Sequence, residues 1–390
     1  MIKPEDFLQE LNANGVEFFA GVPDSLLKEF LTLLQSELPS DKHHITASEG
    51  AAVALAGGYH LATGKIPLVY MQNSGLGNAV NPLMSLSHCQ VYGLPMLLLI
   101  GHRGAPNVKD EPQHTAMGSA TLAILDSLAI PYQSLGGDQI DLETFVSKAV
   151  SRVKTIGSPL AIVVSAGTFD KAKKPLPKRQ AVFGHTRMDV LNSLLKNLKG
   201  DEPIVASTGY NGRELYEARL AESDQEKPSD SGKKSSGDNA VGDFLNVGAM
   251  GHSVAIATGI ALGKPEQAVI CVDGDGSLLM HLGSLVTVGK SAAAVRHLLI
   301  NNGSHESVGG QPTGAGDLDF AALAKIAGYN FSHTLGAAES LDSAMERFLA
   351  AETPAFFEVR VDLGVKDNLA RPSSDFQGSK REFMRFLDQK

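Results

Sequence analysis

The stretch Ala268-Val-Ile-Cys-Val-Asp-Gly-Asp-Gly-Ser277, followed by His297-Leu-Leu-Ile-Asn-Asn302, decides the fold of this 390-residue chain. Each apolar segment has the length and composition of a buried strand, and a helical pattern lies between them from about Leu278. A strand, a helix and a second strand predict a right-handed βαβ unit, which places both strand ends at one edge of a parallel sheet. We therefore expect Asp275 and Asn302 to lie close together.

The residue types at this predicted edge favour a metal ion and a phosphate group. The carboxylate of Asp275, the amide oxygen of Asn302 and a free loop carbonyl are hard oxygen ligands, which suit Mg²⁺ or Ca²⁺. Gly276 and Ser277 are small and stand at the predicted helix start, so phosphate oxygens can approach backbone N–H groups there. The edge therefore predicts a diphosphate ligand held through a metal.

Further apolar runs alternate with helical patterns on both sides of this unit. The strands are predicted at 15–21, 66–71, 95–100 and 160–165 in the first half, and at 203–207, 268–272, 297–300 and 355–360 in the second. This alternation predicts an α/β fold with two parallel-sheet domains and helices on both faces of each sheet.

Composition shifts suggest where these domains begin and end. We expect a first domain at 1–170, a linker at 171–182 with two prolines and five basic residues, a second domain at 183–372 and a helical tail at 373–390. A basic loop inside one domain is the alternative to the linker. The segment 221–240 has no Leu, Ile, Val, Phe or Tyr and is expected to be a mobile polar insertion.

Charge and cysteine content exclude several classes of protein. With 34 basic and 43 acidic side chains the net charge is −9, which argues against a nucleic-acid partner. The two cysteines, Cys89 and Cys271, form no disulfide scaffold or CxxC zinc site and indicate a reducing compartment. The longest clearly apolar run, 94–100, is far short of the roughly 20 residues of a membrane span. We expect a soluble, cytoplasmic protein with no membrane partner.

Two weaker patterns suggest other functions. The loop from Gly75 to Val80 partly matches a dinucleotide-binding fingerprint, but Val80 stands where a small residue is needed. Gly289-Lys-Ser291 resembles the end of a phosphate-binding P-loop, but the earlier glycine is displaced by one residue. A helix C-terminus is the simpler interpretation of the second pattern.

Gly274-Asp-Gly276, 24 intervening residues and Asn301-Asn302 together resemble the metal-diphosphate signature of thiamine-diphosphate (ThDP) enzymes. The resemblance implies ThDP and Mg²⁺ as cofactors, one domain for the aminopyrimidine ring and one for the diphosphate. It also implies that Asp275, Asn302 and the carbonyl of Ser304 hold the metal. Gly274, Gly276 and Ser277 would complete the diphosphate site.

Other segments resemble further parts of the same family. Glu49, in Thr46-Ala-Ser-Glu-Gly50, could simply be a helix N-terminal residue favoured by the dipole. The resemblance instead implies that it hydrogen-bonds a pyrimidine nitrogen and so activates the cofactor's amino group. The Gly75 loop is similar to the glycine loop of 2-oxoacid decarboxylases. In Gly248-Ala-Met-Gly-His252, the Gly248 carbonyl would hold the pyrimidine amino group and Met250 would bend the cofactor.

Within this family, segments along nearly the whole chain resemble the phosphonopyruvate decarboxylases. These segments are Gly21-Val-Pro-Asp-Ser25-Leu-Leu, Gly101-His-Arg-Gly, Lys109-Asp-Glu-Pro-Gln-His114, Thr208-Gly-Tyr-Asn-Gly-Arg-Glu-Leu and Asn301-Asn-Gly-Ser-His-Glu-Ser-Val-Gly-Gly-Gln-Pro-Thr313. The implied reaction is the nonoxidative decarboxylation of 3-phosphonopyruvate to phosphonoacetaldehyde and CO₂ in phosphonate biosynthesis. The insertion at 221–240 departs from the family pattern.

Residues expected to contact the substrate follow from its charge. Arg103 and Lys109 are candidates for neutralising the phosphonate, because a guanidinium fork and an ammonium suit tetrahedral oxyanions. Ser25 is a further candidate for binding the substrate. His114 resembles a histidine in the corresponding loop of related decarboxylases, and the resemblance implies that it is a catalytic residue that relays protons. For Arg103 and Lys109 a solvated surface charge, and for His114 a structural role, remains the alternative.

Several functions and assemblies stay open at this stage. A sulfopyruvate decarboxylase differs only in the anionic head of its substrate, while a nicotinamide-dependent oxidoreductase or a noncatalytic subunit is a more distant alternative. The resemblance implies a homodimer or homotetramer whose active sites lie between subunits, because the two cofactor-binding domains come from different chains.

Overall fold

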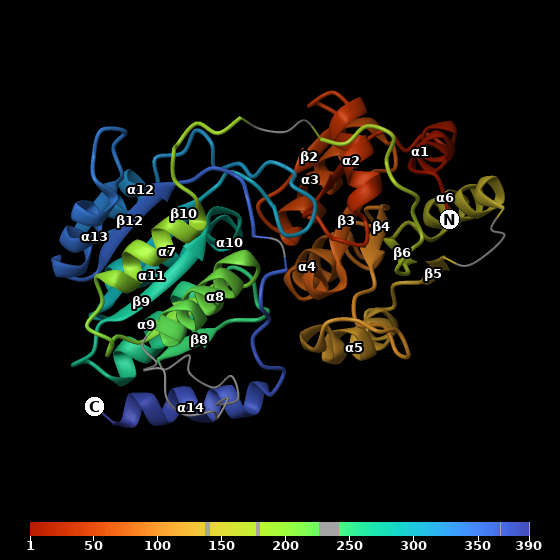
Figure 1. Ribbon diagram of the computed structural model, residues 1–390. Coiled ribbons are helices and arrows are strands. Elements are labelled where there is room, and N and C mark those ends of the chain that lie inside the picture. Colours follow the sequence, from red (N-terminus) through yellow and green to blue (C-terminus); the bar gives the residue numbers. More distant parts are fainter. Residues whose placement is uncertain (137–140, 177–179, 226–241, 367, 390) are drawn as a thin grey trace. The chain divides into compact units, whose positions relative to one another are not determined.

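The computed structural model describes residues 1–136, 141–176, 180–225, 242–366 and 368–389 (Figure 1). The chain forms two compact units. The first comprises Met1–Lys178 and His305–Gly314, and the second comprises Arg179–Ser304 and Ala315–Lys390. None of the helices within the described residues is both long and apolar enough to cross a membrane.

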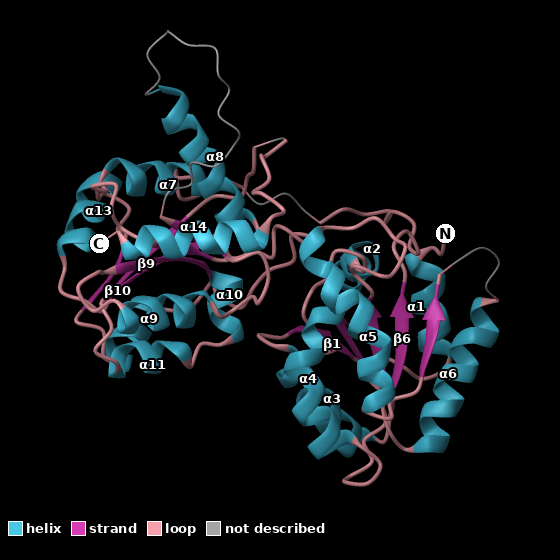
Figure 2. Cartoon of the chain, turned by 90° about the horizontal axis from the view of Figure 1, so that it is seen from below, coloured by secondary structure: helices cyan, strands magenta, loops and turns pink. Residues whose placement is uncertain are grey.

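The first unit contains a six-stranded, all-parallel sheet in the order β2-β1-β3-β4-β6-β5. Helices α1, α2 and α6 contribute buried side chains to one face, and α3, α4 and α5 cover the other (Figure 2). The strands are β1 Phe19–Gly21, β2 His43–Ile45, β3 Leu68–Gln72, β4 Leu97–Gly101, β5 Tyr132–Leu135 and β6 Leu160–Val164. The helices are α1 Pro4–Ala13, α2 Lys28–Glu37, α3 Glu49–Thr63, α4 Leu76–Pro82, α5 Thr115–Ser127 and α6 Leu142–Ile156.

The second unit repeats this architecture with the order β11-β12-β10-β9-β7-β8, again all parallel. Helices α7, α8 and α13 pack on one face and α9, α11 and α12 on the other. The strands are β7 Ile204–Ala206, β8 Asp243–Leu245, β9 Val269–Gly274, β10 Val295–Asn301, β11 Phe331–Thr334 and β12 Ala355–Arg360. The helices are α7 Arg187–Lys196, α8 Tyr210–Gln225, α9 Ser253–Gly263, α10 Asp275–Met280, α11 Ser284–Lys290, α12 Phe320–Ala327, α13 Leu341–Ala350 and α14 Phe376–Asp388.

The predicted fold class is confirmed, and the predicted strands differ from the missed strands in their place in the sheets. The eight strands predicted from apolar runs are the eight interior strands of the two sheets. The four that the sequence pattern missed, β2, β5, β8 and β11, are the four edge strands. An interior parallel strand is buried on both faces and is therefore continuously apolar, whereas an edge strand is partly exposed and mixed in composition.

The helix predicted from about Leu278 and the insertion predicted at 221–240 have other boundaries in the structure. The single helix expected from about Leu278 is two helices: α10 begins at Asp275 and ends at Met280, and α11 begins at Ser284. Helix α8 continues to Gln225, so 221–225 is helical, while 226–240 of the predicted insertion lies outside the described residues. Within the predicted linker, Lys173 and Lys174 pair with Glu5 and Glu37 of the first unit.

Candidate active site

Glu49 is the first residue of α3 and is buried, with 4% of its surface exposed. Its position is set locally, because Ser48 has extended backbone and its hydroxyl accepts the amide of Ala51 at 3.4 Å, which starts the helix. Burial raises the pKa of the Glu49 carboxyl, and a hydrogen bond from Asn78 opposes part of this effect. The raised pKa lets this carboxyl hold its proton to a higher pH than an exposed glutamate does.

The glycine loop supports Glu49 from the side. Asn78 Nδ2 donates to Glu49 Oε2 at 2.9 Å, and a Cβ on Gly75 would lie 2.5 Å from Glu49 Oε1. Gly75 therefore has to be glycine so that the carboxyl can pack against it. This gives the loop a role in positioning Glu49 that the dinucleotide fingerprint does not explain. Asn78 was not predicted as a site residue, although it stands within the quoted loop.

A second polar cluster lies where β1, β3 and β4 end. The Arg103 guanidinium donates to both oxygens of Asp110, at 2.8 Å from Nε and 2.5 Å from Nη2, and to Ser25 Oγ at 2.6 Å. The buried Asn73 side chain donates to the Arg103 carbonyl at 2.8 Å and fixes this backbone. The structure therefore brings the predicted residues Ser25 and Arg103 together, and shows that Arg103 already has a carboxylate partner.

His114 belongs to the same cluster, whereas Lys109 does not pair with it. His114 ends a short 3₁₀ helix and its backbone packs against Gly104, which has a φ of 66°. Burial lowers the pKa of His114, and the charge of Arg103 lowers it further. Lys109 is exposed and makes no ion pair with any described residue.

Asp24 is a buried acidic residue of this cluster that the sequence analysis did not single out. It is 0% exposed, Oδ1 accepts the amide of Leu26 at 2.9 Å, and Oδ2 has no hydrogen-bond partner among the described residues. Burial raises the pKa of Asp24 to about 6, although the nearby Arg103 charge opposes the shift. The signal in the sequence was an acidic residue three positions after the end of a buried strand.

In the second unit, the predicted metal ligands lie at neighbouring strand ends. Gly274 of β9 pairs with Ile300 of β10, so the chain leaves the sheet at Asp275 and Asn302 on the same edge. Asp275 is the first residue of α10 and is 2% exposed. The βαβ prediction for this edge is therefore correct in its geometry.

The loop after β10 is braced by its own side chains. Asn302 Oδ1 accepts the amide of Ser304 at 3.0 Å, and Asn301 Oδ1 accepts the amide of Gly303 at 3.0 Å. Asn301 also donates to Oε1 of the buried Glu358 at 2.8 Å. These contacts give the loop a defined shape and keep the Ser304 backbone next to Asn302.

Two further loops reach the same edge. The Gly251 amide donates to Ser277 Oγ at 3.1 Å, so the loop containing Gly248 and Met250 is tied to α10. The Asn211 side chain, at the start of α8, lies beside Gly274, where a Cβ would be 3.1 Å from Asn211 Nδ2. Sequence reasoning did not identify Asn211, although it follows the strand β7 within a quoted motif.

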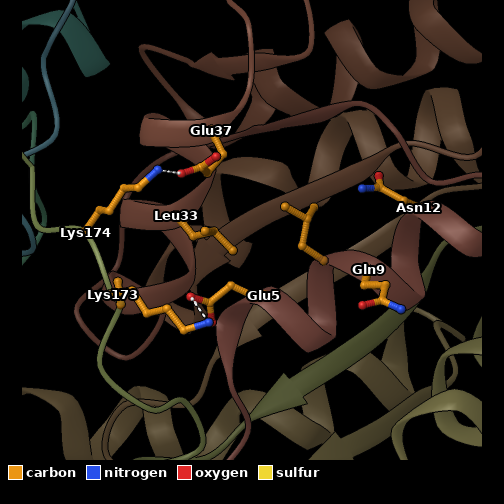
Figure 3. A pocket seen from close by; sticks show the side chains of 9 residues that line it. Glu5, Gln9, Asn12, Leu33, Glu37, Lys173 and Lys174 are labelled. Carbon is orange, nitrogen blue, oxygen red and sulfur yellow. Dashed lines mark hydrogen bonds and ion pairs between the residues drawn. The ribbon is translucent and has the colours of Figure 1, made fainter.

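Two other features lie apart from the predicted site: the segment that resembles a P-loop and a groove in the first unit. Gly289 and Lys290 lie in the last turn of α11, as expected for a helix C-terminus, and Gly289 packs against the Ala327 carbonyl. A groove of about 490 Å³ in the first unit is lined by residues of α1, α2 and 172–174 (Figure 3). None of the predicted site residues lines this groove.

Comparison with known proteins agrees with this arrangement. Residues 4–124 match the N-terminal, and residues 236–359 the C-terminal, TPP binding domain model of the thiamine pyrophosphate enzymes, thiamine pyrophosphate being another name for ThDP. Phosphonopyruvate decarboxylases of Streptomyces viridochromogenes and Streptomyces hygroscopicus are each 33% identical, over 99% of this chain and 95% and 94% of theirs. The sulfopyruvate decarboxylase of Methanosarcina acetivorans is 27% identical over 100% of this chain and 99% of its own. The chain therefore belongs to the thiamine pyrophosphate enzyme family, in the group that includes the phosphonopyruvate decarboxylases.

Proposed function

We propose that this protein decarboxylates 3-phosphonopyruvate to phosphonoacetaldehyde and CO₂ with ThDP and Mg²⁺. The observation that carries the proposal is the presence in one chain of two complementary parts. One is a buried carboxyl, Glu49, held by a glycine loop, and the other is a set of oxygen ligands at the β9–β10 edge. The phosphonate substrate rests on similarity to the Streptomyces enzymes along nearly the full length.

The residues at the β9–β10 edge fit a magnesium ion. Asp275 offers a carboxylate, Asn302 an amide oxygen and Ser304 a backbone carbonyl, which are the hard oxygen donors that Mg²⁺ prefers. The loop that carries Asn302 and Ser304 is shaped by its own hydrogen bonds. We assign these three residues to the metal, and Gly274, Gly276 and Ser277 to the diphosphate.

The first unit supplies acid–base chemistry to the cofactor. When bound, the thiazolium of ThDP accepts the electron pair released as CO₂ leaves. Glu49 would hold a proton at the pyrimidine nitrogen, and its raised pKa favours this because the buried carboxyl resists ionisation.

In the second unit, the Gly248 carbonyl and Met250 would orient the pyrimidine and thiazolium rings.

The Arg103 cluster is our candidate for the phosphonate-binding residues. Three of the five N–H donors of the guanidinium are used by Asp110 and Ser25, so two remain to bind an oxyanion. The Asp110 pair also holds the guanidinium in one orientation, which favours recognition of a tetrahedral anion. Lys109 is exposed on the same segment and would add positive charge.

Proton transfer to and from the substrate requires a group that can take up and release a proton. His114 and Asp24 both lie beside Arg103, and the pKa of Asp24 is about 6. We propose that His114 relays the proton that replaces CO₂, with Asp24 as a second candidate in the same cluster.

Product analysis tests the proposed reaction. Purified protein is incubated with ThDP and Mg²⁺ and with phosphonopyruvate, sulfopyruvate or pyruvate in separate reactions, and aldehyde and CO₂ are quantified. We expect kcat/KM to be highest for phosphonopyruvate. A higher kcat/KM for sulfopyruvate would support the alternative suggested by the methanogen relative, and no CO₂ from any oxoacid would reject the decarboxylase.

We further propose a homodimer, or a tetramer of two such dimers, in which Glu49 of one subunit and the metal ligands of the other serve one cofactor. Mixing inactive Glu49→Gln chains with inactive Asp275→Ala chains tests this, because a hybrid dimer would contain one site without either change. Activity should return in verified hybrids. Hybrids that form and bind ThDP but release no CO₂ would contradict the shared site.

The two cysteines support our expectation of a reducing compartment. Cys89 is exposed and Cys271 is buried, and both are free thiols. An exposed free thiol is typical of proteins kept under reducing conditions such as the cytoplasm.

A further inference from the structure

A group of buried polar side chains lies behind the proposed metal edge, inside the second unit. Cys271 and Asp273 on β9 and His297 on β10 are each 0% exposed. His297 pairs in register with Cys271, and Cys271 belongs to the core between the sheet and helices α9, α11 and α12. One ligand atom of each residue lies within 4.8 Å of those of the other two. Buried polar groups of this kind require partners, because an unpaired group loses its hydrogen bonds to water without replacement.

The contacts of these side chains form a chain that ends at the metal edge. Asp273 Oδ1 accepts the amide of Gly274 at 2.9 Å, and Asp273 Oδ2 lies 3.5 Å from His297 Nε2. His297 Nδ1 lies 3.3 Å from the hydroxyl of Tyr329. Neither Asp273 Oδ2 nor His297 Nε2 has a hydrogen-bond partner among the described residues, so each is available to the other.

The contacts allow a tautomer of His297 in which the Tyr329 hydroxyl donates to Nδ1. In that tautomer the proton is on Nε2, which faces the Asp273 carboxylate. The separation of 3.5 Å between His297 Nε2 and Asp273 Oδ2 is an ion-pair distance and is longer than an ordinary hydrogen bond. His297 then restrains Asp273 on one side while the Gly274 amide restrains it on the other.

We propose that His297 is a positioning residue for the metal–diphosphate edge, acting through Asp273. Gly274 immediately precedes Asp275, so the carboxylate that receives its amide also sets the direction in which Asp275 leaves β9. The proposal rests on the proposed function, because it assumes that Asp275 holds Mg²⁺. Residues that orient metal ligands in this way typically affect metal affinity 10- to 100-fold.

The same side chains do not form a convincing metal site of their own. Asp273 Oδ1 is occupied by a backbone amide, and His297 Nδ1 faces Tyr329. Burial raises the pKa of the Cys271 thiol, which disfavours the thiolate that a metal would need. Cys271 therefore serves as a matched control, since it is equally buried beside His297 but outside the chain of contacts.

The test compares His297→Leu, His297→Gln and Cys271→Ala in the full-length protein. ThDP binding is measured by equilibrium dialysis across a Mg²⁺ titration, alongside the unfolding temperature. For His297→Leu we expect the Mg²⁺ concentration at half-maximal ThDP binding to rise 10- to 100-fold. His297→Gln should stay within about threefold of the native value, because its amide can donate to Asp273, and Cys271→Ala should leave the Mg²⁺ requirement unchanged.

At saturating Mg²⁺ and ThDP, the KM of His297→Leu for the oxoacid should match that of the native protein. Should His297→Leu fail to fold, Tyr329→Phe removes only one hydroxyl and should shift the Mg²⁺ requirement in the same direction by a smaller factor.

Several results would overturn the proposal. The first is an unchanged Mg²⁺ requirement in folded His297→Leu. If the leucine variant does not fold, an unchanged Mg²⁺ requirement in Tyr329→Phe has the same meaning. The second is an equal shift of the Mg²⁺ requirement in His297→Leu and Cys271→Ala. Stoichiometric zinc in the purified protein that is lost in Cys271→Ala would do the same. Asp275→Ala distinguishes failure of the His297 proposal from failure of the metal assignment. Normal Mg²⁺-dependent ThDP binding in that variant would refute the assignment of Asp275 to the metal.

Discussion

The strand ends of the two units hold acidic residues in similar positions but in different ways. Glu49 and Asp275 are each the first residue of a helix and each almost completely buried. Glu49 follows an N-cap serine and contacts the side chain of Asn78, whereas Asp275 follows Gly274 without a side-chain cap. The first arrangement isolates one carboxyl and raises its pKa, while the second gathers oxygen ligands on braced loops. We therefore propose that two units with the same architecture serve acid–base chemistry at one edge and metal binding at the other.

The largest expected effect is at the second edge. Asp275→Ala and Asn302→Ala should each abolish decarboxylation, because loss of an oxygen ligand weakens Mg²⁺ binding and with it retention of the diphosphate. Isothermal titration with ThDP at several Mg²⁺ concentrations checks this. Native ThDP affinity in both variants would mean that this edge does not hold the metal.

Glu49→Gln should distinguish the role of Glu49 in catalysis from the role of the β9–β10 edge in binding ThDP. The variant keeps size and packing but loses the acid, so ThDP should still bind in the presence of Mg²⁺ while kcat falls about 10²- to 10⁴-fold. Hydrogen–deuterium exchange at the cofactor's thiazolium carbon, followed by NMR, should slow by a similar factor. Exchange at the native rate would argue that Glu49 is a structural helix residue.

Gly75→Ala tests whether the glycine loop supports Glu49. The new methyl group would lie 2.5 Å from Glu49 Oε1, so the carboxyl must move, and we expect a loss of activity with about 1–3 kcal/mol of destabilisation. Gly77→Ala is the matched control, because a Cβ there meets nothing within 4 Å. Chemical denaturation and kcat are measured for both, and equal effects would show that the contact with Glu49 is unimportant.

The last prediction concerns the pH dependence of stability at the first edge. The pKa of Asp24 is about 6 in the folded protein and about 3.9 in an unfolded chain. As the pH rises from about 4 to 6, the unfolded state ionises first, so the native protein loses about 2 to 3 kcal/mol of stability. Asp24→Asn carries no charge at this position and should lack that loss. Urea denaturation of both proteins at pH 4.5 and 7.5 measures the difference, and parallel pH profiles would contradict the raised pKa.

Much of the fold was predictable because burial leaves a local trace. The interior strands are continuously apolar, as at 97–101 and 160–164, and the sequence alone located them. The edge strand β11 is only partly buried along its length, so its composition carries no comparable signal. The break between α10 and α11 was also missed, since the helical pattern continues across it.

The sequence by itself determined the α/β class, the places of Asp275 and Asn302 at neighbouring strand ends and the family of the chain, because short motifs and apolar runs specify these locally. The tertiary structure alone decided which side chains support them. Asn78 reaches Glu49 across 29 positions, and Ser25 reaches Arg103 across 78, because the order of strands in the sheet brings their loops together. The contact of Asp273 with His297 likewise depends on the register of β9 and β10. Strand order and register are set by packing of the whole sheet, which no local pattern encodes.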